Sequence, residues 1–444
     1  MLITFSVSNF RSIGNEQTLN LVASKKITGH KNHLVPIDDT QESVLRAAVI
    51  YGANAAGKSN IVRAMASAQQ MVKADVRPLT SIEPFRFSPE FAGKPTSFEF
   101  RFLVNNHVFI YGFDVKGREI IAEWLSVLVE GSEERLVFER DQNGKTTPAQ
   151  SVQALFPADS SIAALLSNAA ALPLTPHQLF LNRVKTLPEE AQSETLRGVL
   201  RWLTRDLVIL LPDFRSSHIL DRIEEDSKFR QLAEAFLDSV GTGVRSFHLA
   251  REEVQPGDAV IGYVRSRLPH SRGALDDVRP KPDESGRYIA RKLFAMHPVG
   301  ASSVPLPFAE ESDGTQQLLH LMPLLAAPVK ETKVFVVDEL DRSLHPLICW
   351  EFIKLFSESA PQAHKQLIVT THEVHLLDQD LLRRDEYWFV EKDNSQQTQL
   401  VSLSDFNVRN DLQIEKGYLH GRFGGIPVIG PLAEIEKLLT DPKV

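Results

Sequence analysis

Residues 52–60, GANAAGKSN, have the spacing of residue types with which proteins bind nucleotide phosphates. In the pattern G-x-x-x-x-G-K-S, backbone N–H groups and the N-terminal dipole of the following helix bind phosphate oxygens. Lys58 would neutralise the β and γ phosphates, and Ser59 would ligate Mg²⁺. An apolar run precedes the segment and an amphipathic helical pattern follows it, which argues against a glycine-rich turn without nucleotide. We expect a P-loop whose nucleotide contacts are Gly52, Asn54, Gly57, Lys58, Ser59 and Asn60.

A second motif, KVFVVDELDRSLHP, contains a short apolar strand that ends in two carboxylates. In a P-loop ATPase, Asp338 would hold Mg²⁺ through water, and Glu339 would polarise the attacking water as general base. An acidic pair at the end of a strand can have a purely structural role, and the P-loop is what favours the catalytic one. The two motifs together predict Mg²⁺-dependent hydrolysis of ATP, with Ser59 and Asp338 as the metal ligands.

Two further segments decide which class of P-loop ATPase fits. Ser312, Asp313 and Gly314 lead a helix in ESDGTQQLLHLMPLL, and a serine hydroxyl with a glycine amide at a helix N-terminus forms an anion-binding element. ATPases of the ABC class need such an element from a second subunit to reach the γ-phosphate. In LIVTTHEVHLLD, His372 follows a buried strand, where that class keeps a histidine against the γ-phosphate. Asp341 lies where the dimer-contacting D-loop belongs.

A lone serine or histidine is more often an ordinary surface or core residue, so the prediction depends on the order of these motifs along the chain. That order favours an ABC-type site. We expect three catalytic residues, namely Lys58, Glu339 and His372.

The chain resembles the ABC-type ATPases of the SMC/RecF/RecN superclass. More narrowly, it resembles the RloA-like bacterial AAA ATPases of phage-defence and abortive-infection systems. The resemblance covers residues 1–130 and 300–430 and is carried by SNFRSIG, GANAAGKSN, ESDGT, FVVDELDRSLHP, TTHEVHLLD and KGYLHGRFGGIP. It implies a composite site between two subunits. One subunit contributes Ser312 and Gly314, and the other contributes Lys58, Ser59, Asp338 and Glu339.

The resemblance also implies a place near the nucleotide for Arg11, although a surface position at a strand end is an equal alternative. It departs from the wider class at two points. The signature reads Ser-Asp-Gly-Thr where transporters have Ser-Gly-Gly-Gln, a change that relatives of this kind share. The Gln-loop role stays unassigned, because Gln69 and Gln70 lie too early, on the helix after the P-loop. The tail LHGRFGGIP predicts a glycine-dependent turn.

The pattern along the chain predicts an α/β fold: an ABC-type P-loop ATPase head with a mixed core sheet and an antiparallel β subdomain, split by a helical insertion. LITFSVSNF alternates and indicates an edge strand, and SFEFRF indicates an antiparallel meander. The middle of the chain combines helical patterns with prolines and lacks the sustained heptads of a long coiled coil. We therefore divide the chain into an N-terminal head half at 1–135, a mainly helical insertion or lid at 136–298, and a C-terminal head half at 299–444.

Composition narrows the possible partners. The chain has 444 residues and a net charge of −8, so its overall field does not attract nucleic acid or anionic membrane. The single cysteine, Cys349, excludes an internal disulfide framework, and its apolar surroundings predict a core position. No stretch approaches the ~18 apolar residues that span a bilayer. We expect a cytoplasmic protein without membrane contacts.

Two functions fit these motifs. In the first, the ATPase closes between subunits on ATP and controls a separately encoded effector, a nuclease, in a bacterial anti-phage module. In the second, it is a DNA-repair or maintenance clamp of the RecF/SMC kind. The basic segment GRYIARK, 286–292, is compatible with DNA contacts, but a solvated helix or strand face is the favoured interpretation. The expected cofactors are ATP and Mg²⁺, and the expected partners are a second copy of the chain and the effector, with DNA possible.

Overall fold

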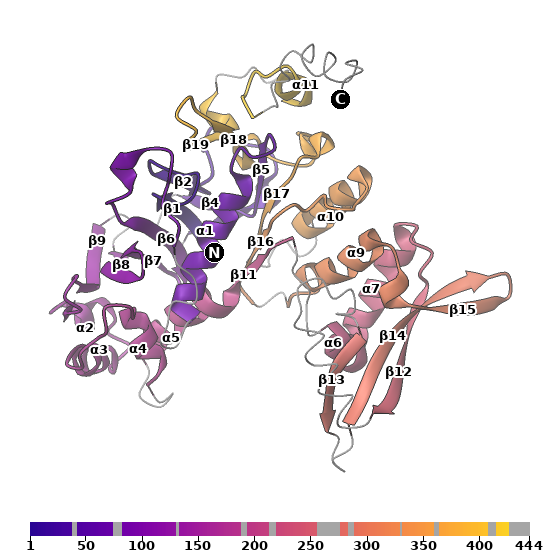
Figure 1. Ribbon diagram of the computed structural model, residues 1–444, viewed down its shortest axis with the longest axis horizontal. Helices are drawn as coiled ribbons and strands as arrows, with labels where there is room; N and C mark the ends of the chain where they lie inside the picture. The colour runs from indigo at the N-terminus through magenta and orange to yellow at the C-terminus, as the bar shows by residue number, and fades with distance from the viewer. Residues whose placement is uncertain are drawn as a thin grey trace, which may run out of the picture.

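A six-stranded sheet built from distant parts of the chain lies at the centre of the molecule (Figure 1). This computed structural model describes residues 1–37, 42–73, 82–129, 133–187, 193–212, 219–254, 276–282, 288–328, 331–358, 364–406 and 414–425. The strand order is β11 (Leu207–Leu210), β16 (Lys333–Val337), β17 (Lys365–Thr370), β5 (Ala47–Gly52), β18 (Tyr387–Lys392) and β19 (Thr398–Ser402). The first five strands are parallel, so their carboxyl ends meet at one edge of the sheet. Because β5 lies between β17 and β18, the two ends of the chain share one sheet.

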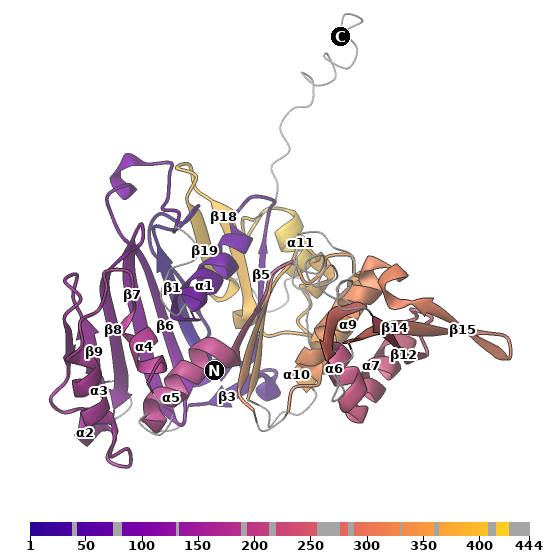
Figure 2. The same cartoon turned by 60° about the horizontal axis from the view of Figure 1, so that its bottom comes forward.

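Helices cover both faces of this sheet. Successive residues of a strand point to opposite faces, and those of β5 divide accordingly between two cores. Ala48 and Ile50 belong to the core that contains α1, whereas Val49 and Tyr51 belong to the core that contains α9 and α10. The bounds are α1 Lys58–Lys73, α9 Asp313–Leu325 and α10 Pro346–Glu358. Figure 2 shows α1 on one side of the strands and α9 and α10 on the other. Cys349 lies in the second core as expected, and burial raises the pKa of its thiol to about 12.

A seven-stranded antiparallel sheet flanks the α1 side of the molecule (Figure 2). Its order is β10 (Thr146–Pro148), β9 (Glu133–Arg140), β8 (Glu119–Val129), β7 (His107–Lys116), β6 (Thr96–Val104), β1 (Leu2–Ser8) and β2 (Gln17–Asn20). Phe98, Phe100 and Phe102 all face the core, which confirms the alternation read from SFEFRF. The edge position expected for the N-terminal strand is wrong, because β1 pairs with β6 on one side and β2 on the other. Alternation reports one buried face and carries no information about neighbouring strands.

The segment between the two halves is not uniformly helical. Its helices are α2 Val152–Leu155, α3 Ile162–Ala170, α4 Phe180–Lys185, α5 Glu194–Arg201, α6 Ile219–Glu225 and α7 Ser227–Ser239. However, β9 and β10 extend the antiparallel sheet into it, and β11 joins the central sheet. A further antiparallel sheet contains β12 Ser246–Val254, β13 Asp276–Pro282, β14 Tyr288–Val299 and β15 Ser302–Pro307. The expectation of a mainly helical 136–298 is therefore corrected, while the division into three domains stays a prediction. No helix within the described residues is long and apolar enough to cross a bilayer.

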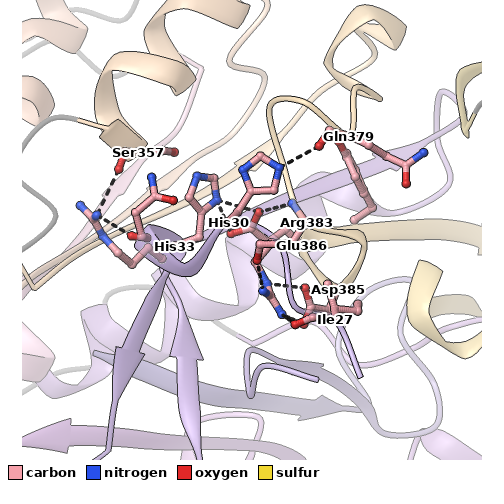
Figure 3. A network of polar contacts seen from close by, with 12 residues as sticks. Ile27, His30, His33, Ser357, Gln379, Arg383, Asp385 and Glu386 are labelled. Atoms are coloured by element: carbon pink, nitrogen blue, oxygen red, sulfur yellow. Dashed lines mark hydrogen bonds and ion pairs between the residues drawn. The ribbon is translucent and has the colours of Figure 1, made fainter. Parts of the chain in front are cut away.

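A buried polar network ties the N-terminal segment to the C-terminal half (Figure 3). The Arg383 guanidinium donates to the carbonyl oxygens of Gly29 (2.6 Å) and Ile27 (3.1 Å) and pairs with Asp385 at 2.9 Å. His33 Nδ1 lies 3.0 Å from both carboxylate oxygens of Glu386, and both side chains are buried. The other short elements are β3 Leu34–Pro36, β4 Ser43–Leu45, α11 Ile414–Leu419 and the single turns η1 Lys31–His33, η2 Pro89–Phe91, η4 Trp202–Asp206, η5 Phe308–Glu310, η6 Val374–Leu376, η7 Arg384–Glu386 and η8 Leu403–Asp405. The contacts of Arg383 and Glu386 tie the segment before β3 to the turn that leads into β18.

Candidate nucleotide-binding site

The P-loop connects β5 to α1 at the edge where the parallel strands end. At Gly57 the backbone has a φ of 117°, and a Cβ there would lie 2.1 Å from Thr398 Oγ1. At Gly52 a Cβ would lie 2.4 Å from the carbonyl oxygen of Val390. Both glycines of the motif are thus required by close approach, and Gly57 also by its left-handed backbone. Asn54 is exposed at the turn between them, where it is free to meet a nucleotide.

A chain of hydroxyl groups braces the P-loop from behind. Asn60 Nδ2 donates to Ser12 Oγ (2.7 Å), which is 2.7 Å from Thr398 Oγ1. Thr398 Oγ1 in turn donates to the carbonyl oxygen of Ala56 (2.9 Å). Asn60 therefore holds the loop through Ser12, and its contact with nucleotide stays a prediction. Arg11 precedes Ser12 with a φ of 52°, so the structure places it beside this brace, and its role toward nucleotide likewise stays a prediction.

Lys58 is folded back over the loop. Its ammonium donates to the carbonyl oxygens of Gly52 (2.7 Å) and Ala53 (3.2 Å), and Nζ lies 3.0 Å from Nε2 of His372. Burial lowers the pKa of Lys58 to about 8, and the carboxylates of the neighbouring loop oppose the shift only in part. Lys58 therefore begins to lose its proton near pH 8, and a bound phosphate would raise this pKa again and keep the side chain charged.

We expect ATP affinity to fall as the pH rises through about 8. Only the ammonium form of Lys58 attracts phosphate, and binding raises its pKa, so binding takes up a proton. Above pH 8 the apparent Kd for ATP should rise by up to about tenfold per pH unit. A fluorescent-nucleotide titration from pH 7.5 to 9.5 measures this. The Lys58→Arg variant, whose guanidinium does not titrate, should lose the dependence. An unchanging Kd in the native protein would contradict the prediction.

Ser59 and Asp338 meet where the metal ion is expected. Asp338 is buried at the end of β16, and its Oδ1 accepts bonds from Ser59 Oγ (3.1 Å) and Thr370 Oγ1 (2.6 Å). Its second oxygen, Oδ2, is buried without a hydrogen-bond partner among the described residues. A buried oxygen in that state costs free energy unless a ligand completes it. Hydroxyl and carboxylate oxygens are the donors that Mg²⁺ prefers, so these residues fit the ion.

The other three predicted residues of this half-site surround the same edge. Glu339 is half-buried with a left-handed φ of 56°, which turns the chain sharply out of β16. The Asp341 carboxylate accepts the backbone N–H of His372 (3.2 Å), which joins the loops after β16 and β17. Desolvation and the adjacent ammonium of Lys58 lower the pKa of His372. The imidazole is therefore neutral near pH 7, and Nε2 can accept a hydrogen bond from the Lys58 ammonium.

The signature residues lie elsewhere. Ser312 caps α9 by accepting the N–H of Thr315 (3.1 Å), and Ser312 and Asp313 are exposed. Gly314 packs against the loop after β16, where a Cβ would lie 2.5 Å from the carbonyl oxygen of Ser343. Because α9 and α1 occupy opposite faces of the sheet, Ser312 is separated from the P-loop of its own chain. Among the described residues, no hydrogen bond or ion pair joins residues 312–314 to the P-loop.

Two further predictions concern Gln69 on α1 and the glycine-dependent turn of the tail. Gln69 is buried and donates to the carbonyl oxygens of Leu203 (2.9 Å) and Leu207 (2.6 Å), so it ties α1 to β11 and is not placed as a Gln-loop residue. The tail forms the glycine-dependent turn, since Gly421, Gly424 and Gly425 all have positive φ. The last residues of the tail motif, 426–427, lie outside the described residues.

Comparison with known families identifies the chain. The sequence profile of the family described as "AAA domain, putative AbiEii toxin, Type IV TA system" matches residues 47–378. That range starts with the P-loop strand and ends after His372, so it includes the P-loop, the signature, both carboxylates that follow β16, and the histidine. The chain belongs to this family. As a member of this AAA family, the protein is a nucleotide-binding ATPase, as the P-loop motif predicted. The narrower resemblance to RloA-like ATPases stays a prediction.

Solved structures of SMC heads are similar to this chain at low identity. The SMC head domain from Thermotoga maritima is 14% identical, with 90% of this chain and 98% of that one covered at a TM-score of 0.36. The Smc head bound to the C-terminal domain of ScpA, from Pyrococcus furiosus, is 13% identical, with 95% and 98% covered at a TM-score of 0.38. An SMC head bound to the C-winged helix domain of ScpA is 15% identical, with 90% and 97% covered at 0.37. No curated protein matches the chain.

Proposed function

We propose that the protein is an ATP-driven switch in which two copies close on each other around nucleotide. The separation of the two half-sites is the observation that carries this proposal. Lys58, Ser59, Asp338, Glu339 and His372 gather at one edge of the sheet, while Ser312 caps a helix on the opposite face. The exposed N-terminus of a helix can bind an anion that another molecule presents to it. A second copy would bring its nucleotide to Ser312 and Gly314.

Each residue then has a role in hydrolysis. The P-loop amides and Lys58 would hold the phosphates, and the Lys58 ammonium would exchange its carbonyl contacts for phosphate oxygens. Bound Mg²⁺, held by Ser59 and Asp338, would supply charge neutralisation at the β and γ phosphates. Glu339 would orient and polarise the attacking water, and His372 would contact the γ-phosphate. Closure is a population shift that depends on contacts to the γ-phosphate, and hydrolysis reopens the pair.

The family description supports a role in bacterial anti-phage defence. The family description names the AbiEii toxin of a type IV toxin–antitoxin system. We propose that opening and closing control a separately encoded effector, which we infer to be a nuclease. The charges of the chain favour this over a DNA clamp. Within the basic segment 286–292, Arg291 is paired with Asp221 (2.6 Å) and Glu224 (2.7 Å), so its charge is compensated within the protein. Residues 286–287 lie outside the described residues.

A pull-down from host lysate tests what the switch controls. Glu339→Gln protein should retain a stoichiometric protein partner that differs between ATP and ADP, with nuclease activity in the eluate. The matched control is Glu339→Gln with Ser312→Arg, which keeps the P-loop half-site and blocks closure. Its eluate should be the same with either nucleotide. Recovery of DNA alone, held only with ATP, would establish the clamp function and overturn the defence role.

A further inference from the structure

Thr370 contacts both acidic residues of the site, although the sequence motifs assigned it no role. It is the last residue of β17 and is fully buried. Its hydroxyl donates to Asp338 Oδ1 (2.6 Å) and accepts the backbone N–H of Glu339 (2.8 Å). A threonine hydroxyl has one proton to donate, so this geometry fixes the direction of that proton toward Asp338. One side chain thus contacts both the carboxylate expected at the metal and the residue expected to be the base.

These bonds occur where the ladder between β16 and β17 stops. The last paired residues of the two strands are Val337 and Val369. Beyond them the chain turns through Glu339, whose left-handed φ of 56° is a strained conformation for a residue with a side chain. The Thr370 hydroxyl accepts the N–H of Glu339, and the Thr370 carbonyl oxygen accepts the N–H of Leu340 (3.0 Å). Thr370 therefore provides two of the acceptors that hold this turn.

The same hydroxyl decides how Asp338 presents its carboxylate. Ser59 and Thr370 both donate to Oδ1, which leaves Oδ2 as the buried oxygen without a partner among the described residues. Without Thr370, the carboxylate would lose its shortest hydrogen bond and the constraint on its rotation. Loss of a residue that hydrogen-bonds a metal-ligating carboxylate typically lowers metal affinity or activity about 10–100-fold.

We propose that Thr370 is a positioning residue that sets Asp338 and Glu339 together for hydrolysis. The inference rests on the proposed roles of these two residues in the ATPase reaction. It couples them, because any movement of the Thr370 hydroxyl changes the carboxylate of Asp338 and the backbone of Glu339 at once. Lys58 is not bonded to Thr370, so nucleotide affinity and catalysis respond differently to its loss.

Thr370→Val tests this, because it replaces the hydroxyl with a methyl group of similar size. We expect kcat to fall about tenfold to a hundredfold and the half-saturating Mg²⁺ concentration to rise, while the Kd for ATP changes less than about threefold. Thr370→Ser should recover kcat to within about threefold, since it keeps the hydroxyl. A purely structural role would lower the melting temperature without changing the Mg²⁺ dependence.

The controls separate the possible failures. Thr146, a buried threonine on β10, has a hydroxyl without a hydrogen-bond partner among the described residues, so Thr146→Val should leave all three quantities unchanged. Should Thr370→Val fail to bind ATP, the pair Thr370→Ser and Thr370→Ala still isolates the hydroxyl, and equal kcat values in that pair overturn the proposal. Native kcat in Thr370→Val overturns it too. If Glu339→Gln retains native turnover, the proposed base is at fault and Thr370 loses the role built on it.

Discussion

Replacing Glu339 with glutamine is expected to lower kcat by about 10²–10⁴-fold, the range that a general base contributes. Glutamine has the same shape and cannot accept the proton of the attacking water. The substitution leaves the turn intact, because Thr370 bonds the backbone N–H of Glu339 and not its side chain. ATP affinity should change little, since the Lys58 contacts are untouched. Phosphate release and a nucleotide titration measure the two quantities.

The same variant should accumulate the closed pair with ATP. Sedimentation or light scattering should show a dimer with ATP and a monomer with ADP. Ser312→Arg is the matched control, because it fills the exposed cap of α9 on the face of the sheet opposite the P-loop. Added to Glu339→Gln, it should leave ATP binding intact and return the protein to a monomer. A dimer that survives in the double variant would exclude Ser312 from the interface. Native turnover in Glu339→Gln alone would mean that another residue is the base.

The sequence motifs predicted the half-site at the P-loop because each of its parts is local. GANAAGKSN fixes a strand, a turn and a helix start, and FVVDE fixes a strand and its end. Parallel strands then bring Ser59 and Asp338 together at one edge without further information. The contacts that complete the site are not local. Thr370 reaches Asp338 across 32 residues, and Thr398 reaches Ala56 across 342. A single threonine in a strand carries no signal of such a contact.

The strands between the head halves were not predicted, because charged residues lie along them. β12 reads SFHLAREEV and pairs with β14 along nine residues. Arg251 on β12 and Arg291 on β14 both form ion pairs with Glu224 of α6. These charges interrupt the apolar alternation by which a strand is recognised, although Phe247 and Leu293 at the other end of the two strands join the core. The proline content of the region excluded a coiled coil and gave no information on this sheet.

Replacing Lys58 with alanine should remove nucleotide binding. Hydrogen bonds from an ammonium to phosphate oxygens are charge-assisted, and losing them costs about 3 kcal/mol or more, which corresponds to ~100-fold or more in Kd. The fold should survive the change. Burial lowers the pKa of Lys58, so its charged form is less stable in the folded protein than in the unfolded chain near pH 7. Removing it should leave the melting temperature without nucleotide equal or higher.

Lys73→Ala provides the control from the other end of the same helix. The 16 residues of α1 span about 24 Å, so Lys73 lies far from the P-loop, where its ammonium donates to Gln69 Oε1 (2.8 Å). Its loss should leave ATP affinity unchanged. Isothermal titration of both variants with ATP, together with thermal melting in its absence, separates lost binding from lost folding. A Lys58→Ala protein that melts normally and keeps native ATP affinity would show that GANAAGKSN is not the phosphate site, and every role assigned around it would fall.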